Sequence, residues 1–153
     1  MEVSWLRFEV ADQGYALPLG AVVEVMAAPR PHLIPRVSLE LAGVVNVRGE
    51  PLPAVDGGAL LTGVSALQYR HMLVLERGSL RLGVLVGGVQ RIERALALVE
   101  QEVTHSGELV EWVTEGEKAL GLVDPDGLIE RGVLLLTELR SRAGGQEPWQ
   151  SGF

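Results

Sequence analysis

The stretch Gly43–Asp56, GVVNVRGEPLPAVD, places polar residues inside a run that otherwise has the composition of a buried strand. Arg48 is the residue of this stretch best suited to recognition. A guanidinium presents five N–H donors in a rigid planar fork, which can hold a carboxylate in a bidentate pair. On a short turn, Arg48 would present this fork to a carboxylate of a partner. The alternative interpretation is a solvated loop arginine, and the spacing alone leaves both open.

The same stretch ends in a carboxylate that suggests hydrolysis. The segment Val55–Gly63, VDGGALLTG, is similar to the Asp-Thr-Gly loop of aspartic proteases, in which two carboxylates share a proton. Asp56 would then be the catalytic residue of a dimeric hydrolase. However, Gly57 stands where the bracing hydroxyl belongs, and the chain has no second loop of this kind. The simpler interpretation is that Asp56 ends a strand.

No other residues have the spacing of a catalytic, metal or cofactor site. The three histidines, His32, His71 and His105, lie in separate segments without a metal-ligand pattern. The chain has no cysteine, which excludes disulfides and thiolate nucleophiles. The sequence therefore predicts no catalytic residue, no metal and no cofactor.

Short strands joined by tight turns are predicted to position these residues. The segments Leu6–Val10 and Tyr15–Leu19 alternate apolar with polar or small residues around the turn sequence ADQG. Arg48-Gly49 and Arg77-Gly78 each separate two apolar runs, and Gly49 and Gly78 are predicted to supply the positive φ of a hairpin turn. A further hairpin is predicted around TEGEK, Thr114–Lys118.

Prolines and glycines refine these expectations. Pro51 and Pro53 lack ladder donors, so the strand that follows Arg48 is predicted to be an edge strand or bulged. The segment Asp124–Gly127, DPDG, is predicted to form a tight turn. Helical periodicity is clear only in Leu128–Arg142, where Gly132 favours a short turn followed by a terminal helix. The pattern predicts an all-β fold of small barrels or a sandwich.

Composition limits the kind of partner. With 153 residues, 22% of them charged, the chain fits a single globular domain. The net charge of −7 and scattered basic residues disfavour nucleic acid and favour a partner with a basic or mixed surface. No apolar run approaches the length of a membrane helix, so we expect a soluble cytoplasmic protein without direct membrane insertion.

The stretch around Arg48 resembles the signature of the CheW-like domain family, in which Gly-x-x-Asn-x-Arg-Gly precedes a strand ending in Pro-x-x-Asp. Three further stretches are similar in the same order: the opening hairpin, the middle hairpin and the final strand and turn. The matching motif positions are Gly43, Asn46, Arg48, Gly49, Pro53 and Asp56, and the three stretches are Phe8–Met26, Leu73–Val89 and Leu120–Ile129.

This resemblance implies an all-β fold of two small five-stranded, barrel-like subdomains that share a hydrophobic core, with short helical turns and a C-terminal helix. It also implies a non-enzymatic adaptor that couples the cytoplasmic tips of chemoreceptors to the regulatory domain of a CheA-type histidine kinase, recruited to membrane-anchored receptor arrays. The residues given partner-binding roles by the resemblance are Arg48, Asn46, Gly43 and Val25.

Two features depart from the family pattern. Gly87-Gly88 stands where many members carry an aspartate, and the tail with Trp149 has no counterpart. We expect one CheW-like domain over residues 1–140 and a polar tail over 141–153. A CheW-like module that serves another signalling partner is the remaining alternative to a chemotaxis adaptor.

Overall fold

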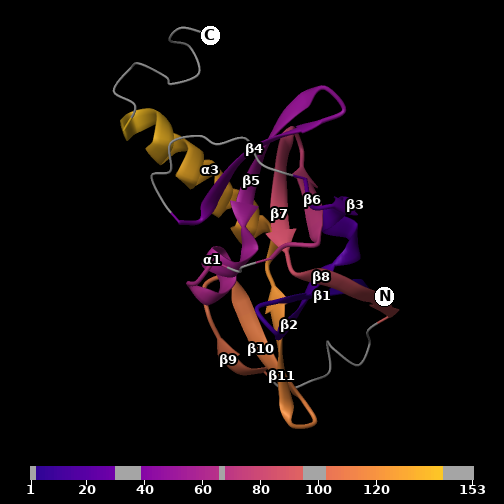
Figure 1. The fold of residues 1–153 in the computed structure, drawn as a ribbon. Coiled ribbons are helices and arrows are strands. Elements are labelled where there is room, and N and C mark those ends of the chain that lie inside the picture. Colours follow the sequence, from indigo (N-terminus) through magenta and orange to yellow (C-terminus); the bar gives the residue numbers. More distant parts are fainter. Residues whose placement is uncertain (1–2, 30–38, 66–67, 95–102, 143–153) are drawn as a thin grey trace, which may run out of the picture.

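The computed structural model describes residues 3–29, 39–65, 68–94 and 103–142, which form two β-sheets, a long C-terminal helix and two short helical segments (Figure 1). The first sheet has six strands in the order β8-β1-β2-β11-β10-β9. Its strands are β1 (Ser4–Val10), β2 (Gln13–Pro18), β8 (Gly88–Arg94), β9 (Val103–Ser106), β10 (Val110–Glu115) and β11 (Lys118–Val123).

The second sheet has five strands in the order β3-β6-β7-β5-β4. Its strands are β3 (Val22–Ala27), β4 (Leu41–Val47), β5 (Glu50–Asp56), β6 (His71–Arg77) and β7 (Leu80–Val86). The chain passes from the first sheet to the second through the 3₁₀ turn η1 (Leu19–Ala21) and returns through β8. Helix α1 (Gly57–Thr62) follows β5, and α3 (Pro125–Arg142) follows β11.

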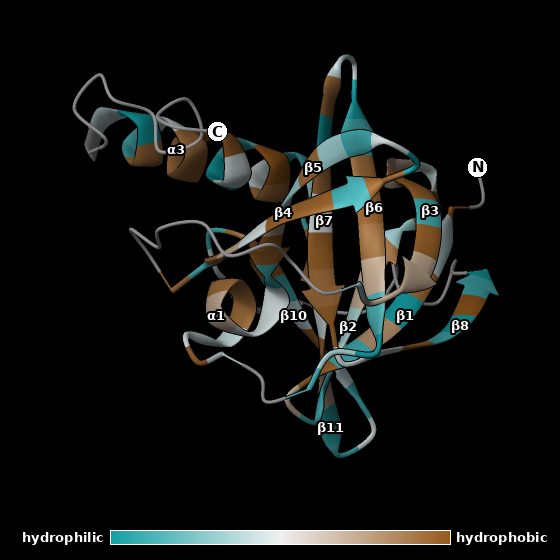
Figure 2. Cartoon of the chain, turned by 45° about the horizontal axis from the view of Figure 1, so that its top comes forward, coloured by the Kyte–Doolittle hydropathy of each residue, from teal (hydrophilic) through white to brown (hydrophobic). Residues whose placement is uncertain are grey.

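One apolar core is shared by the two sheets and α3. The first sheet contributes Phe8 and Tyr15, whose rings stack with centroids 5.7 Å apart. Leu73 and Val84 of the second sheet and Leu128 of α3 belong to the same buried cluster. The opposite faces of the sheets enclose two smaller clusters, one around Val113 and one around Val45. Brown apolar residues accordingly concentrate on the central strands in Figure 2.

An ion-pair cluster links non-adjacent strands of the first sheet. Arg7 of β1 is buried and pairs with Glu93 of β8 and with Glu115 of β10. Its Nη1 donates to Glu115 Oε1 at 2.6 Å, and Nη2 donates to the other carboxylate oxygen. Because β2 and β11 separate β1 from β10 in the sheet, this contact requires the sheet to curl. Hydrogen bonding to Arg7 lowers the pKa of Glu115 and raises that of the guanidinium.

The predicted fold class is confirmed, with one difference in strand number. The structure has the expected mostly β architecture with a shared core and a C-terminal helix, and the predicted hairpins are β1–β2, β4–β5, β6–β7 and β10–β11. The first sheet has six strands where five were expected, because β9 pairs with β10. The two Arg-Gly hairpins lie in the same sheet, joined by the parallel pair β5–β7.

Of the two alternatives predicted for β5, an edge strand or a bulged one, the edge position is wrong, while its pairing with β4 has a register shift between Leu41 and Gly43. This strand lies between β4 and β7, although it contains Pro51 and Pro53. In a two-residue hairpin, the ring nitrogens of these prolines point away from β4. On that side, pairing with β7 begins only at Ala54. The prolines therefore occupy positions at which no ladder donor is needed.

The predictions of a tight turn at Asp124–Gly127 and of an interrupted helix are also wrong. Asp124 precedes the first turn of α3, where its Oδ1 accepts the Asp126 N–H at 3.1 Å and its carbonyl accepts the Leu128 N–H at 3.1 Å. Proline suits the first helical position that follows such a cap. Gly132 lies inside α3, where the helix packs closely on Leu82: a Cβ at this position would lie 2.8 Å from Leu82 Cδ1. Glycine thus permits close packing of α3 on the second sheet.

Of the glycine pair Gly87-Gly88, only Gly87 stands at a close backbone approach, since a Cβ at Gly88 would have its nearest neighbours at 3.9 Å. The Gly87 N–H donates to the Glu9 carbonyl at 2.8 Å, and a Cβ at position 87 would lie 2.9 Å from that oxygen. The backbones at Gly87 and Glu9 therefore approach each other closely. α3 extends to Arg142, two residues past the expected domain boundary at 140. The tail that contains Trp149 lies outside the described residues.

We predict that Glu115→Gln lowers the free energy of unfolding by about 1–3 kcal/mol at pH 7, since a buried charge-assisted hydrogen bond is weakened. Because Arg7 lowers the folded-state pKa of Glu115, the stabilisation is present above the unfolded pKa and is lost as pH falls through the folded value. Urea unfolding from pH 7 to pH 3 should show a shallower loss of stability for the variant.

The matched control is Glu117→Gln in the exposed β10–β11 turn, which should change stability by less than about 0.5 kcal/mol. Parallel pH profiles for wild type and Glu115→Gln would contradict the assignment of this pair.

Candidate functional site

The turn that carries Arg48 is a two-residue hairpin loop between β4 and β5. Arg48 and Gly49 both have positive φ, 50° and 83°, which is the pattern of a type I′ turn. The Asn46 side chain stabilises it by accepting the Gly49 N–H at 2.8 Å. A left-handed conformation is uncommon for arginine and has a cost of about 1–2 kcal/mol. The turn therefore holds Arg48 in a conformation that a free loop rarely adopts.

The second Arg-Gly pair forms a different turn. Gly78 has φ of 61° and occupies the first turn position, because Arg77 is the last residue of β6 and pairs with Leu80. Arg77 instead lies 3.5 Å from both Asp126 and Glu130 of α3. The same dipeptide thus presents Arg48 from a hairpin tip and directs Arg77 toward a helix.

Arg48 already has a carboxylate partner within the chain. Its Nη1 lies 2.7 Å from Glu24 Oε1 on β3, while the arginine side chain remains 71% exposed. The hydrogen bond that the Arg48 guanidinium donates to Glu24 raises the pKa of Arg48, so the guanidinium stays charged. The sequence analysis missed Glu24. Its signal is a single acidic residue among the valines of VVEV, at an alternating position that turns toward the sheet interior.

The Arg48–Glu24 pair joins the two edge strands of the second sheet. β3 and β4 stand at opposite ends of the strand order, so the contact requires this sheet to curl as well. Glu24 Oε2 is buried and has no hydrogen-bond partner among the described residues. Losing Arg48 would therefore leave a partly buried carboxylate without its cation, which is costly.

Exposed valines flank Glu24 on β3. Val25 is 41% exposed, as its predicted partner-binding role requires, and Val23, which the sequence analysis did not single out, is 50% exposed. We call Val23, Glu24, Val25 and Arg48 the β3–Arg48 surface. It combines apolar contact area with a fixed charge, which is a common composition for a protein-binding patch.

The other two residues predicted to bind a partner, Asn46 and Gly43, belong to the backbone framework of the β4–β5 hairpin. Asn46 is exposed, but its side-chain oxygen is engaged by the turn. Gly43 is buried within β4, beside a register shift in the pairing with β5, and has φ of 149°. The structure brings Asn46 and Arg48 together at one turn, whereas Gly43 is buried within the edge strand β4.

Asp56 is placed for structure and not for hydrolysis. Its carboxylate is 1% exposed, and one oxygen accepts the Ala59 N–H at 3.0 Å at the start of α1. The hydroxyls of Ser65 and Tyr69 also donate to it. A shared-proton dyad needs a carboxylate open to substrate and to a second copy. The hypothesis of Asp56 as a catalytic residue therefore fails on burial.

The described parts of the chain contain neither a metal-ligand cluster nor a membrane-spanning helix. No group of three or more histidine, aspartate or glutamate side chains is arranged to hold a metal ion there. None of the described helices is long and apolar enough to cross a membrane.

A comparison with protein families matches the CheW-like domain model to residues 4–132, which is most of the chain. The chain belongs to the CheW-like domain family. The fold agrees: scaffolding protein TtCheW from Thermoanaerobacter tengcongensis superposes with a TM-score of 0.69 at 17% identity, over 81% of this chain and 85% of that one. The CheW-like family is one of non-catalytic adaptors, and the buried position of Asp56 fits it.

Two relatives were found by sequence. Protein PilI of Pseudomonas aeruginosa is 37% identical over 90 residues, covering 56% of this chain and 51% of PilI. Chemotaxis protein CheW of Rhizobium meliloti is 34% identical over 94 residues, covering 57% of each. The matched regions span just over half the length of these curated relatives.

We predict that Gly49→Val lowers the free energy of unfolding by about 1–3 kcal/mol, because a β-branched residue resists positive φ. A Cβ at position 49 meets nothing within 4 Å, so the cost is one of backbone conformation and not of steric contact. Gly49→Asn is the matched control, since asparagine tolerates this region, and it should lose less than half as much in thermal and urea unfolding. Equal losses for both variants would contradict the turn assignment.

Proposed function

We propose that this chain is a cytoplasmic signalling adaptor that couples chemoreceptors to a CheA-type histidine kinase in chemotaxis or a related motility pathway. The observation that carries the proposal is the β3–Arg48 surface in a CheW-like domain. The adaptor has no reaction to perform: it holds two partners together and transmits a change in one to the other. Recruitment to a receptor array is part of the proposal.

The geometry supports a specific role for each part of this surface. Glu24 holds the guanidinium in a defined direction, and most of the Arg48 side chain is exposed to a partner carboxylate. Val23 and Val25 supply exposed apolar area on the same strand, on the face opposite Glu24. Pre-organisation by the turn and by Glu24 reduces the entropy lost on binding. Asn46 contributes through the turn, and Gly43 through the backbone of β4.

We predict that Arg48→Glu weakens binding to the regulatory domain of a CheA-type kinase or to a receptor tip by about 2–5 kcal/mol, if the contact is a desolvated ion pair. The measurement is a calorimetric titration of wild type and variant against each partner, with circular dichroism to confirm folding. Wild-type protein that binds neither partner would refute the coupling proposal and favour a CheW-like module with another signalling partner.

A charge swap separates two ways in which Arg48 can act. Glu24→Arg combined with Arg48→Glu restores the internal ion pair with reversed polarity. If Arg48 acts only by closing the sheet, the double variant should bind as wild type does. If its guanidinium contacts the partner, the double variant should stay weak while its unfolding midpoint recovers. Val25→Ser is a second probe, since it removes apolar area without touching the ion pair.

A further inference from the structure

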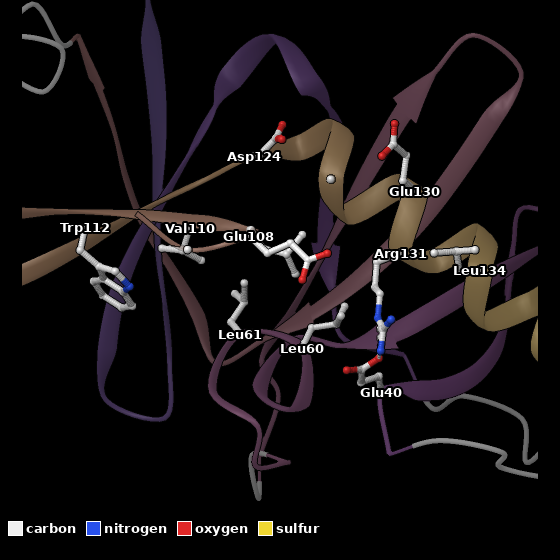
Figure 3. A pocket seen from close by; sticks show the side chains of 13 residues that line it. Glu40, Leu60, Leu61, Glu108, Val110, Trp112, Asp124, Glu130, Arg131 and Leu134 are labelled. Atoms are coloured by element: carbon white, nitrogen blue, oxygen red, sulfur yellow. Dashed lines mark hydrogen bonds and ion pairs between the residues drawn. The ribbon is translucent and has the colours of Figure 1, made fainter. Parts of the chain in front are cut away.

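A groove on the side of the molecule that carries α1 and α3 shares no residue with the β3–Arg48 surface. It has a volume of about 520 Å³ and is bounded by α1, by residues 107–109 and by the first half of α3 (Figure 3). We call it the Trp112 groove. Its lining includes Leu60, Leu61, Trp112 and Leu134.

The apolar residues of the groove are held by contacts with the hydrophobic core. Leu60, Leu61 and Trp112 are half-buried and pack against the core shared by the sheets. The Trp112 ring also lies 5.6 Å from that of Tyr15. Leu134 of α3, by contrast, is 55% exposed. The groove thus offers apolar surface on a rigid base.

Carboxylates surround this apolar surface. Glu40, Glu108, Asp124 and Glu130 line the groove, and Arg131 is the one basic residue in its lining. Arg131 is engaged by Glu40, with Nε and Nη2 3.0 and 2.9 Å from Oε2. Among the described residues, Glu108 and Asp124 have no lysine or arginine within ion-pair distance. Glu130 lies 3.5 Å from Arg77 outside the groove. Glu108 and Asp124 are therefore the two lining carboxylates that favour a cationic occupant.

The walls of the groove are held by backbone hydrogen bonds. The Gly107 N–H donates to the Val110 carbonyl at 2.8 Å, and the Asp124 N–H donates to the Leu109 carbonyl at 2.9 Å. The second bond ties the segment before β10 to the start of α3. β10 itself is paired on both sides, by β9 and β11, so it offers no free ladder to an extended peptide. A helix satisfies its own backbone and needs only side-chain contacts.

We infer that the Trp112 groove binds a basic amphipathic helix of a partner protein. Leucines or aromatic residues of the helix would lie on Leu61, Trp112 and Leu134, and its lysines or arginines would face Glu108 and Asp124. The chain's own residues 143–153 fit poorly because they contain one acidic residue and no basic one. A second copy fits poorly too, because each carries a net charge of −7.

The test uses a synthetic helix-forming peptide of about 18 residues, with leucines at i, i+3, i+4 and i+7 and lysines on the flanking positions. Binding to the full chain is followed by fluorescence anisotropy, and the contact is located by ¹⁵N chemical-shift changes, including that of the Trp112 indole N–H. We expect saturable binding that weakens with salt, with shifts at Leu61, Trp112 and Leu134. A peptide with glutamates in place of the lysines should not bind.

Matched variants separate this groove from general attraction to an acidic protein. Leu134→Ser and Glu108→Lys each alter an exposed residue and should weaken binding by about tenfold. Glu117→Lys makes the same charge change in the β10–β11 turn and should change affinity less than about twofold. Circular dichroism confirms that the variants fold.

Three kinds of result would overturn the inference. The first is equal weakening by Glu108→Lys and Glu117→Lys, or undetectable binding of the lysine peptide to wild type. The second is binding that appears only after residues 143–153 are removed, which would make the chain's own tail the occupant. The third is concentration-dependent self-association that Leu134→Ser abolishes, which would make a second copy the occupant.

Discussion

The apolar core between the two sheets is the interaction on which the rest of this fold depends. Each sheet directs one face into it, and α3 closes it with residues such as Leu128. Phe8 and Tyr15, which stack here, are the largest fully buried side chains of the first sheet. Because apolar burial has little directionality, this core brings the sheets together without determining how each sheet curls.

In each sheet, one arginine makes a directional contact across the curled strands. Arg7 links β8 and β10 from a buried position, and Arg48 links the edge strands β3 and β4 from the rim. The Arg7–Glu115 and Arg48–Glu24 pairs each join strands that are not neighbours in their sheet. They differ in exposure: the Arg7 side chain is 8% exposed and that of Arg48 is 71% exposed. The first is suited to stability alone, and the second also meets the solvent, where a partner can reach it.

The distribution of polar groups favours binding over chemistry. Asp56, the carboxylate that sequence alone made a candidate for hydrolysis, is buried and caps α1. Exposed apolar residues occur on the same elements as exposed charges, Val23 and Val25 on the strand that pairs with Arg48 and Leu134 in the groove that Glu108 lines. The two proposed surfaces are built from different elements, so the adaptor function that we propose could use both at once.

The sequence by itself determined the features that depend on neighbouring residues. Alternation predicted the hairpins, glycine chemistry predicted the positive φ at Gly49, and the motif around Arg48 indicated the family. Features that depend on distant segments were decided only by the tertiary structure. Pro53 is compatible with an interior strand because the pairing of β5 with β7 begins only at the next residue. Gly132 lies within a helix that packs closely on Leu82. Arg48 is paired because folding brings Glu24 of β3 to it. Local periodicity cannot encode which strands become neighbours, since that choice is made by burial of the whole chain.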